Sequence, residues 1–82
     1  MFESSKLINE HLKNAAASGE GLSLRQWSIL FGMSPTYLNL ILKSERLISE
    51  RALLKVVKGL DLDDISKNNL IEIRNFDWLK LK

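Results

Sequence analysis

Apolar residues recur along most of this chain at the three- and four-residue spacing of one helical face. The first such segment runs from Ser4 to Ala17, with inward positions at Leu7, Ile8, His11, Leu12 and Ala15. Two glycines, Gly19 and Gly21, follow it, and glycine disfavours a continued helix. The pattern therefore predicts a first helix and then a loop over residues 18–21.

A second helix is predicted between Ser23 and Phe31. Ser23 and Gln26 have the spacing of a capping box, in which each side chain bonds the other residue's backbone N–H. Gly32 follows Phe31, where a helix commonly ends on a left-handed residue that glycine adopts without strain.

A third helix is predicted from Pro35 to about Lys43. Ser34 supplies its cap, and proline at the first helical position loses no hydrogen bond. Polar residues 44–46 then predict a connection.

Two more helices follow. Ser49 is expected to cap residues 50–58, which Gly59 ends, and Asp61 or Asp63 to cap a helix to about Ile73. The inward positions of the fourth helix are Ala52, Leu53, Val56 and Val57, followed by Leu60 after its end. The residues expected to anchor the fifth helix are Leu62, Ile65, Leu70 and Ile73. The expected fold is an all-α, compact bundle of four to five short helices.

The last residues fit neither the helical nor the strand period. A helical extension, a short strand and a loosely packed arm all remain open for this segment. We therefore divide the chain into one domain over residues 1–70 and a C-terminal tail over residues 71–82.

Composition narrows the possible functions. The 82 residues suffice for one domain, and the net charge of +2 neither indicates nor excludes a polyanionic partner. With one histidine, no cysteine and no glycine-rich phosphate loop, the chain lacks the members of a catalytic triad or a usual zinc site. We therefore expect no enzyme activity, no metal and no cofactor, and the Asp61, Asp63 and Asp64 cluster is interpreted as a helix cap.

The expected location is the cytoplasm. The N-terminal residues lack the layout of a signal peptide, and the longest apolar runs, such as Ile29-Leu30-Phe31, are far shorter than a membrane span. We therefore expect no membrane partner.

Residues 24–43 have the features of two short helices that cross through a tight turn. Ser28 is small enough for close approach, and Gly32 suits the turn. The inner positions are Trp27, Phe31, Met33, Leu38 and Ile41, which predicts core roles for both aromatic residues.

This stretch resembles the helix-turn-helix of the lambda-repressor-like family, which includes Cro, CI and Xre-type regulators. The resemblance covers roughly Leu7 to Leu62 and extends to Arg46 and the fourth helix that Ser49 opens. It implies a transcription regulator, such as a repressor, that binds double-stranded DNA as a homodimer.

The resemblance also assigns contacts. The helix from residue 35 to 43 is expected in the major groove, with Thr36, Asn39, Leu40 and Lys43 at the bases. The residues expected at phosphates are Ser23, Arg25, Gln26, Tyr37, Ser44 and Arg46. Alternatively, Arg46 pairs with Glu45 or Glu50, and Tyr37 is half-buried. If DNA binds here, Arg25, Lys43 and Arg46 should gather around the third helix, away from acidic residues.

Some positions depart from the family pattern. Ile29 and Leu30 are apolar on the expected outer side of the second helix, and Leu40 is apolar on the expected DNA face. Either the tail covers Ile29 and Leu30 through Trp78 or Phe76, or this surface binds a protein.

The candidate dimer residues are Ile71, Ile73, Phe76, Trp78 and Leu79. The alternative functions are a protein-interaction module, such as an antirepressor or a docking domain, and a structural oligomerisation domain.

Overall fold

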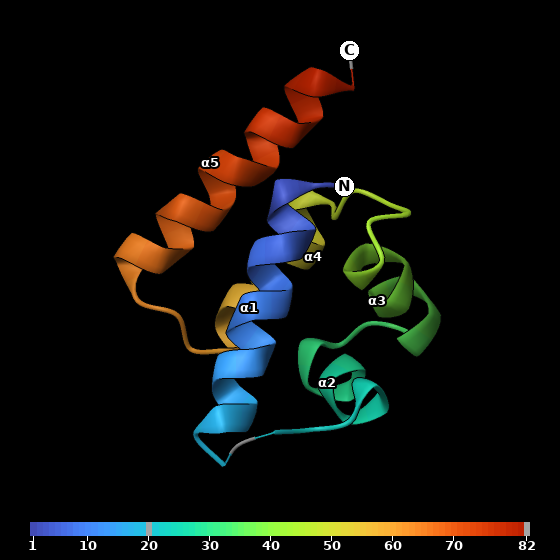
Figure 1. Cartoon of the computed structure of the whole chain (residues 1–82), viewed down its shortest axis with the longest axis vertical. Helices are drawn as coiled ribbons and strands as arrows, with labels where there is room; N and C mark the ends of the chain where they lie inside the picture. The colour runs from blue at the N-terminus through green and yellow to red at the C-terminus, as the bar shows by residue number, and fades with distance from the viewer. Residues whose placement is uncertain (20, 82) are drawn as a thin grey trace.

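The computed structural model describes residues 1–19 and 21–81 and folds them into five helices without a strand. In chain order these are α1 (Glu3–Ala17), α2 (Leu24–Phe31), α3 (Pro35–Leu42), α4 (Glu50–Gly59) and α5 (Asp64–Lys80). Helix α1 lies in the middle, with α5 on one side and α2 and α3 on the other, while α4 contacts α2 and α5 (Figure 1). The predicted all-α bundle is confirmed.

One apolar core joins all five helices. Its buried members are Ile8, Trp27, Phe31, Leu38, Ile41, Ile48, Ala52, Leu53, Val56, Val57 and Leu70. Trp27 and Phe31 stack with their ring centroids 5.4 Å apart. Both aromatic side chains are therefore core residues, as their helical spacing predicts.

The predicted helix ends are confirmed at the caps of α2, α3 and α4. The Ser23 and Gln26 capping box is complete, and Gly32 has a φ of 65°. The hydroxyl groups of Ser34 and Ser49 accept hydrogen bonds from the backbone at Tyr37 and Ala52. Local sequence therefore determines where these three helices begin.

Helix α5 begins at the second of the two expected caps. The Asp63 carboxylate accepts a 2.8 Å hydrogen bond from the backbone N–H of Ser66. This bond, with a further one from the Ser66 side chain, holds the pKa of Asp63 below its usual value. The interpretation of this acidic residue as a helix cap is confirmed.

The predicted end of α5 near Ile73 and the anchoring role of Ile65 are both wrong. The helix continues to Lys80, which is the helical extension among the three alternatives for the last residues, and Ile65 is 82% exposed. The boundary drawn after residue 70 falls inside this helix. Glu20 of the expected loop and Lys82 of the expected tail lie outside the described residues.

Charged side chains hold the second half of α5 against the bundle. The Arg74 guanidinium donates a 2.9 Å hydrogen bond to the Ile48 carbonyl and lies 3.7 Å from the Glu50 carboxylate. Leu70, Arg74 and Asp77 share one helical face because they are four and three residues apart. Two charged residues on the inward face explain why the apolar period fails here.

Asp77 caps α1 from a distant part of the chain. Its carboxylate is 2% exposed and accepts hydrogen bonds from the backbone N–H groups of Glu3 (3.2 Å) and Ser4 (2.8 Å). The Ser4 hydroxyl donates a third bond of 2.7 Å. Phe2, at the N-cap position of α1, offers no side-chain cap. Asp77 therefore satisfies helix N–H groups that otherwise lack a partner.

We expect Ser5→Ala to raise the free energy of unfolding by about 1 kcal/mol. The Ser5 hydroxyl is buried without a hydrogen-bond partner among the described residues, and alanine favours a helix more than serine does. Ser4→Ala is the matched comparison and should be destabilising, since it removes the bond to Asp77. Urea unfolding measures both, and a loss of stability in Ser5→Ala would contradict the prediction.

Candidate nucleic-acid interface

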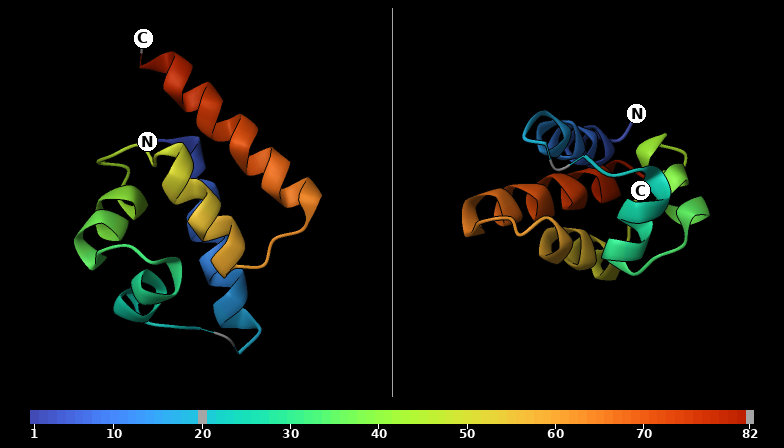
Figure 2. Two further views of the ribbon diagram at one scale, coloured as in Figure 1. Left: turned by 180° about the vertical axis from the view of Figure 1, so that it is seen from behind. Right: turned by 90° about the horizontal axis from the view of Figure 1, so that it is seen from below.

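Helix α3 forms an outer edge of the bundle. It packs on α1 and α2, on the side of the molecule opposite α5 (Figures 1 and 2). The turn between α2 and α3 is closed by a 3.0 Å hydrogen bond from the backbone N–H of Met33 to the carbonyl of Ser28. Ser28 is fully buried where α2 and α3 approach each other, as its small size predicts. None of the other described helices covers the outer face of α3.

The four predicted base-contacting residues lie along this helix and its end. Thr36 and Lys43 are exposed, whereas Asn39 and Leu40 are half-buried. The side-chain amide of Asn39 makes no hydrogen bond to any described residue. In contrast, the Asn9 amide on α1 is engaged, since it donates to the carbonyls of Ser5 and Leu42. The Asn39 amide is thus available to an external partner.

The predicted phosphate contacts at the start of α2 are partly engaged within the protein. The Ser23 hydroxyl accepts from Gln26, and the Gln26 side chain accepts from the Ser23 backbone. Both side chains act only as acceptors in these bonds, so the Ser23 O–H and the Gln26 amide N–H groups remain available as donors. Arg25 is exposed and lines a groove with Pro35, the first residue of α3.

The remaining predicted phosphate contacts lie after or beside α3. The Tyr37 hydroxyl accepts a 3.2 Å hydrogen bond from the backbone of Ser49, so this half-buried side chain links α3 to the start of α4. The Ser44 hydroxyl accepts a 3.2 Å bond from the backbone of Phe2. Ser44 therefore also has a structural role at the N-terminus.

Arg46 does not pair with Glu45 or Glu50, so that alternative is wrong. Its guanidinium lies 5.9 Å from the centroid of the Tyr37 ring, a cation–π arrangement. Glu50 is instead the partner of Arg74 from α5. Arg46 thus presents its charge beside α3 without a carboxylate partner among the described residues.

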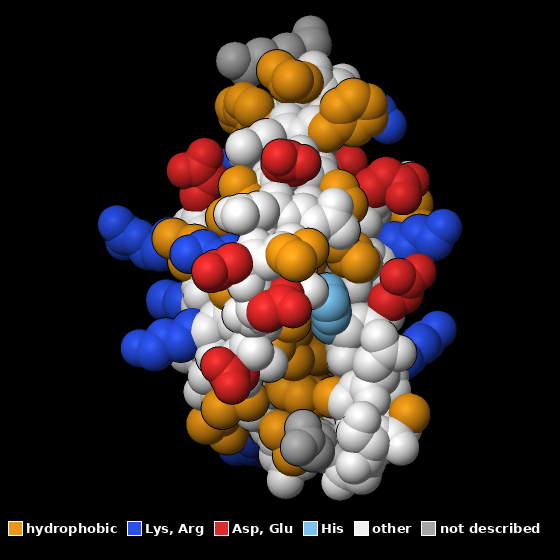
Figure 3. Space-filling view, turned by 90° about the vertical axis from the view of Figure 1, so that its left-hand side faces the viewer, with side chains coloured by type: hydrophobic (Ala, Val, Ile, Leu, Met, Phe, Trp, Pro, Cys, Tyr) orange, Lys and Arg blue, Asp and Glu red, His pale blue; other side chains and the backbone are white. Residues whose placement is uncertain are grey.

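Charge is divided unevenly along the chain. Residues 21–59 contain the basic residues Arg25, Lys43, Arg46, Arg51, Lys55 and Lys58, against Glu45 and Glu50. The acidic residues of the described helices and turns otherwise lie in α1, α5 and the α4–α5 turn. On the side of α5, Figure 3 shows acidic side chains across the middle of the face and basic ones mainly at its edges. The segment that contains α2, α3 and α4 is therefore more basic than α1 and α5.

The tail does not cover the apolar residues on α2, so that expectation is wrong. Ile29 is 72% exposed and Leu30 is 51% exposed. Helix α5 packs against α1 and α4 rather than α2, which keeps Phe76 and Trp78 away from this surface.

The five candidate dimer residues fall into two groups. Ile71 packs against the core and Ile73 is half-buried, whereas Phe76, Trp78 and Leu79 are exposed. Leu81 is exposed as well, and hydrophobic side chains gather at the C-terminal end of α5 in Figure 3.

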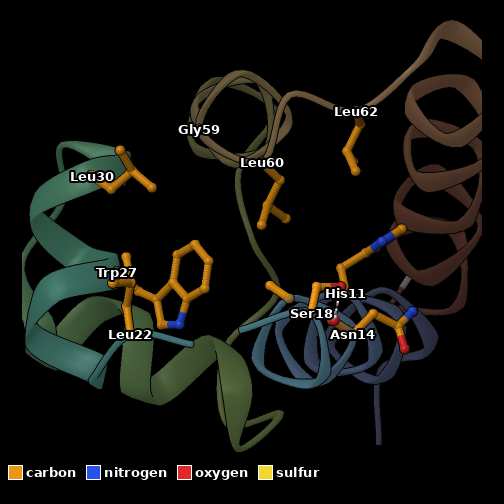
Figure 4. Close-up of a pocket in the computed structure, with 10 residues that line it drawn as sticks. His11, Asn14, Ser18, Leu22, Trp27, Leu30, Gly59, Leu60 and Leu62 are labelled. Atoms are coloured by element: carbon orange, nitrogen blue, oxygen red, sulfur yellow. Dashed lines mark hydrogen bonds between the residues drawn. The ribbon is translucent and has the colours of Figure 1, made fainter. Parts of the chain in front are cut away.

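A hollow of about 460 Å³ opens between α1, α2 and the end of α4. Its wall includes Trp27, Leu60 and Leu62, with His11 at one side (Figure 4). His11 is half-buried, as expected for a packing residue.

Comparison with protein-family models, curated proteins and solved structures finds no match, so the family resemblance stays a prediction. No helix within the described ranges is long and apolar enough to cross a membrane. In the same part of the chain, no group of three acidic or histidine side chains is placed to hold a metal ion.

Proposed function

We propose that this chain is a lambda-repressor-like regulator that binds double-stranded DNA with α3 in the major groove. The observation that carries the proposal is the outer face of α3, where Thr36 and the unengaged Asn39 amide are available. An asparagine amide pairs with the donor and acceptor of adenine, and threonine contacts a thymine methyl or a base edge.

Cations at both ends of α3 support the same role. Arg25 shares a groove with the first residue of α3, and Lys43 directly follows its last residue. The Arg46 guanidinium lies beside the helix, over the Tyr37 ring. Such side chains bind phosphates on either side of a groove and set the position of the helix without reading sequence. The free backbone N–H groups at the start of α2 provide a further phosphate contact.

The proposal includes a homodimer formed through the C-terminal part of α5. Phe76, Leu79 and Leu81 are exposed there beside Trp78, whose ring centroid lies 5.6 Å from the Arg74 guanidinium. The inward face is occupied by Arg74 and Asp77, so the exposed Phe76, Leu79 and Leu81 side chains lie outside the core. A two-fold dimer would present two copies of α3 to two half-sites.

Selection of bound sequences from random duplex DNA, repeated at two salt concentrations, tests the proposed function. We expect one motif to be enriched, arranged as a palindrome if the dimer is correct. Weaker binding at the higher salt is expected because phosphate contacts release counterions. Failure to enrich any sequence at either salt concentration would overturn specific DNA binding.

We expect Asn39→Ala to weaken binding to the selected duplex by about 1.4 kcal/mol, roughly tenfold in Kd. The change removes an amide that no described residue engages, so the fold should be unaffected. Asn68→Ala, at an exposed asparagine of α5, is the matched control and should bind like the parent. Fluorescence anisotropy measures both, and equal affinities of the two variants would refute the assignment of Asn39.

A further inference from the structure

The outer face of α2 carries an apolar ridge that the fold does not use. Ile29 and Leu30, the two most exposed apolar side chains of this helix, form the ridge. Trp27 and Phe31 of the same helix already supply its contacts with the core. Large apolar side chains that remain exposed next to one another are typical of an interaction site.

Hollows flank the ridge on both sides. Ile29 separates a groove of about 600 Å³, beside the start of α3, from one of about 400 Å³ between α2 and α4. Leu30 separates the second groove from the hollow that contains Trp27 and His11 (Figure 4). The surface therefore alternates projecting side chains with depressions, the shape that side chains of a second helix fill.

The rim of these grooves is basic. Arg25 lines the groove beside α3, and Lys55 and Lys58 line the groove beside α4. The Lys55 ammonium also donates a 3.3 Å hydrogen bond to the Gly32 carbonyl at the end of α2. No acidic residue of the described chain lines either groove.

We propose that this face binds an amphipathic helix of a partner protein, whose apolar stripe meets Ile29 and Leu30 and whose acidic flank meets Lys55 and Lys58. The groove beside α3 is shared with the proposed DNA interface through Arg25 and Pro35, whereas Leu30, Lys55 and Lys58 lie outside that interface. The contacts with Leu30, Lys55 and Lys58 therefore do not depend on DNA binding. Charge complementarity selects the partner, because acidic side chains are attracted to this rim and basic ones are repelled.

Other occupants fit the surface less well. A second copy docked face to face would bring Lys55 and Lys58 of both copies close together, and like charges disfavour that contact. An extended peptide that binds by adding a β-strand needs an exposed sheet edge, and the described chain has no strand. A helix satisfies its own backbone and presents only side chains, which suits the ridge and grooves.

Two stapled amphipathic peptides with the same leucine stripe test the proposal, one with glutamate and one with lysine on both flanks. The isotope-labelled protein is titrated with each peptide and followed by NMR. We expect the glutamate peptide to shift amide signals of residues 24–32 and 55–59 and to bind about tenfold more tightly than the lysine peptide. Equal affinities, no binding of the glutamate peptide, or shifts confined to other helices would overturn the proposal.

Variants locate the contact. Ile29→Ser combined with Leu30→Ser should weaken binding of the glutamate peptide at least about tenfold. Ile65→Ser, at an isoleucine on α5 that is also largely exposed, is the control and should leave that affinity unchanged. Lys55→Glu combined with Lys58→Glu should reverse the preference between the two peptides.

Sedimentation provides a separate check of the occupant. If the parent protein is a dimer and Ile29→Ser dissociates it, the occupant is a second copy of the chain and the proposal is overturned.

Discussion

Replacing Asp77 with alanine is expected to lower the free energy of unfolding by about 3 kcal/mol. The change removes three hydrogen bonds at the start of α1 and leaves the backbone N–H groups of Glu3 and Ser4 without their partner. It also removes the hydrogen bonds that Asp77 makes between the second half of α5 and α1. For a domain of this size, the Tm should fall by roughly 12–24 °C.

Two comparisons separate this cap from a general effect of losing a charge on α5. Glu72→Ala removes an exposed carboxylate from the same helix and should change stability by less than about 0.5 kcal/mol. In a double-mutant cycle, Ser4→Ala and Asp77→Ala should cost less together than the sum of the single changes, because they share a hydrogen bond. Equal Tm values for Asp77→Ala and Glu72→Ala would show that the cap does not stabilise the fold.

Replacing Gly59 with valine is expected to destabilise the protein by about 3 kcal/mol. A Cβ atom at this position would lie 2.5 Å and 2.8 Å from the Cδ1 and Cε1 atoms of Phe31. Phe31 is 2% exposed and stacks on Trp27, so its ring has little room to move. Helices α2 and α4 would therefore have to separate. Gly59→Ala should show a smaller effect of the same sign, since it adds only the Cβ atom.

Lys58→Val is the matched control for Gly59→Val. It introduces the same β-branched residue at an exposed position of α4 and should cost less than about 1 kcal/mol. Phe31→Ala removes the ring that the new side chain meets, so Gly59→Val should cost less in that background than in the parent. Additive losses of stability would mean that the clash with Phe31 is not the cause.

The first four helices can be predicted from local sequence because each has one apolar face and three begin at a serine cap. Helix α5 is different beyond Leu70. Its inward side chains there include Arg74 and Asp77, whose partners are the Ile48 carbonyl and the start of α1. These partners come from distant parts of the chain, and no local period shows them. The same contacts leave Phe76 and Leu79 exposed to solvent, which explains why the apolar residues of this segment do not follow the helical period.

In the candidate site, local sequence predicts the positions of the residues but not their hydrogen bonds. The positions of Thr36, Asn39 and Lys43 follow from the helical period and the cap at Ser34. The hydrogen bond between the Ser44 hydroxyl and the Phe2 backbone cannot be predicted in this way, because these residues are 42 positions apart. The hydrogen bond between Tyr37 and Ser49 cannot be predicted either, because it depends on how α3 approaches α4. Local patterns therefore identify the exposed face of α3 but not which of its polar groups the fold already uses.

The most direct test of the central claim is the salt dependence of duplex binding by two charge-matched triple variants. One replaces Arg25, Lys43 and Arg46 with glutamine, and the other replaces Lys6, Lys13 and Lys67, which lie on α1 and α5. If α3 faces DNA, the slope of log Kd against log salt should fall by about 3 in the first variant and barely change in the second. Equal slopes in the two variants, or a larger fall in the second, would contradict DNA binding through α3.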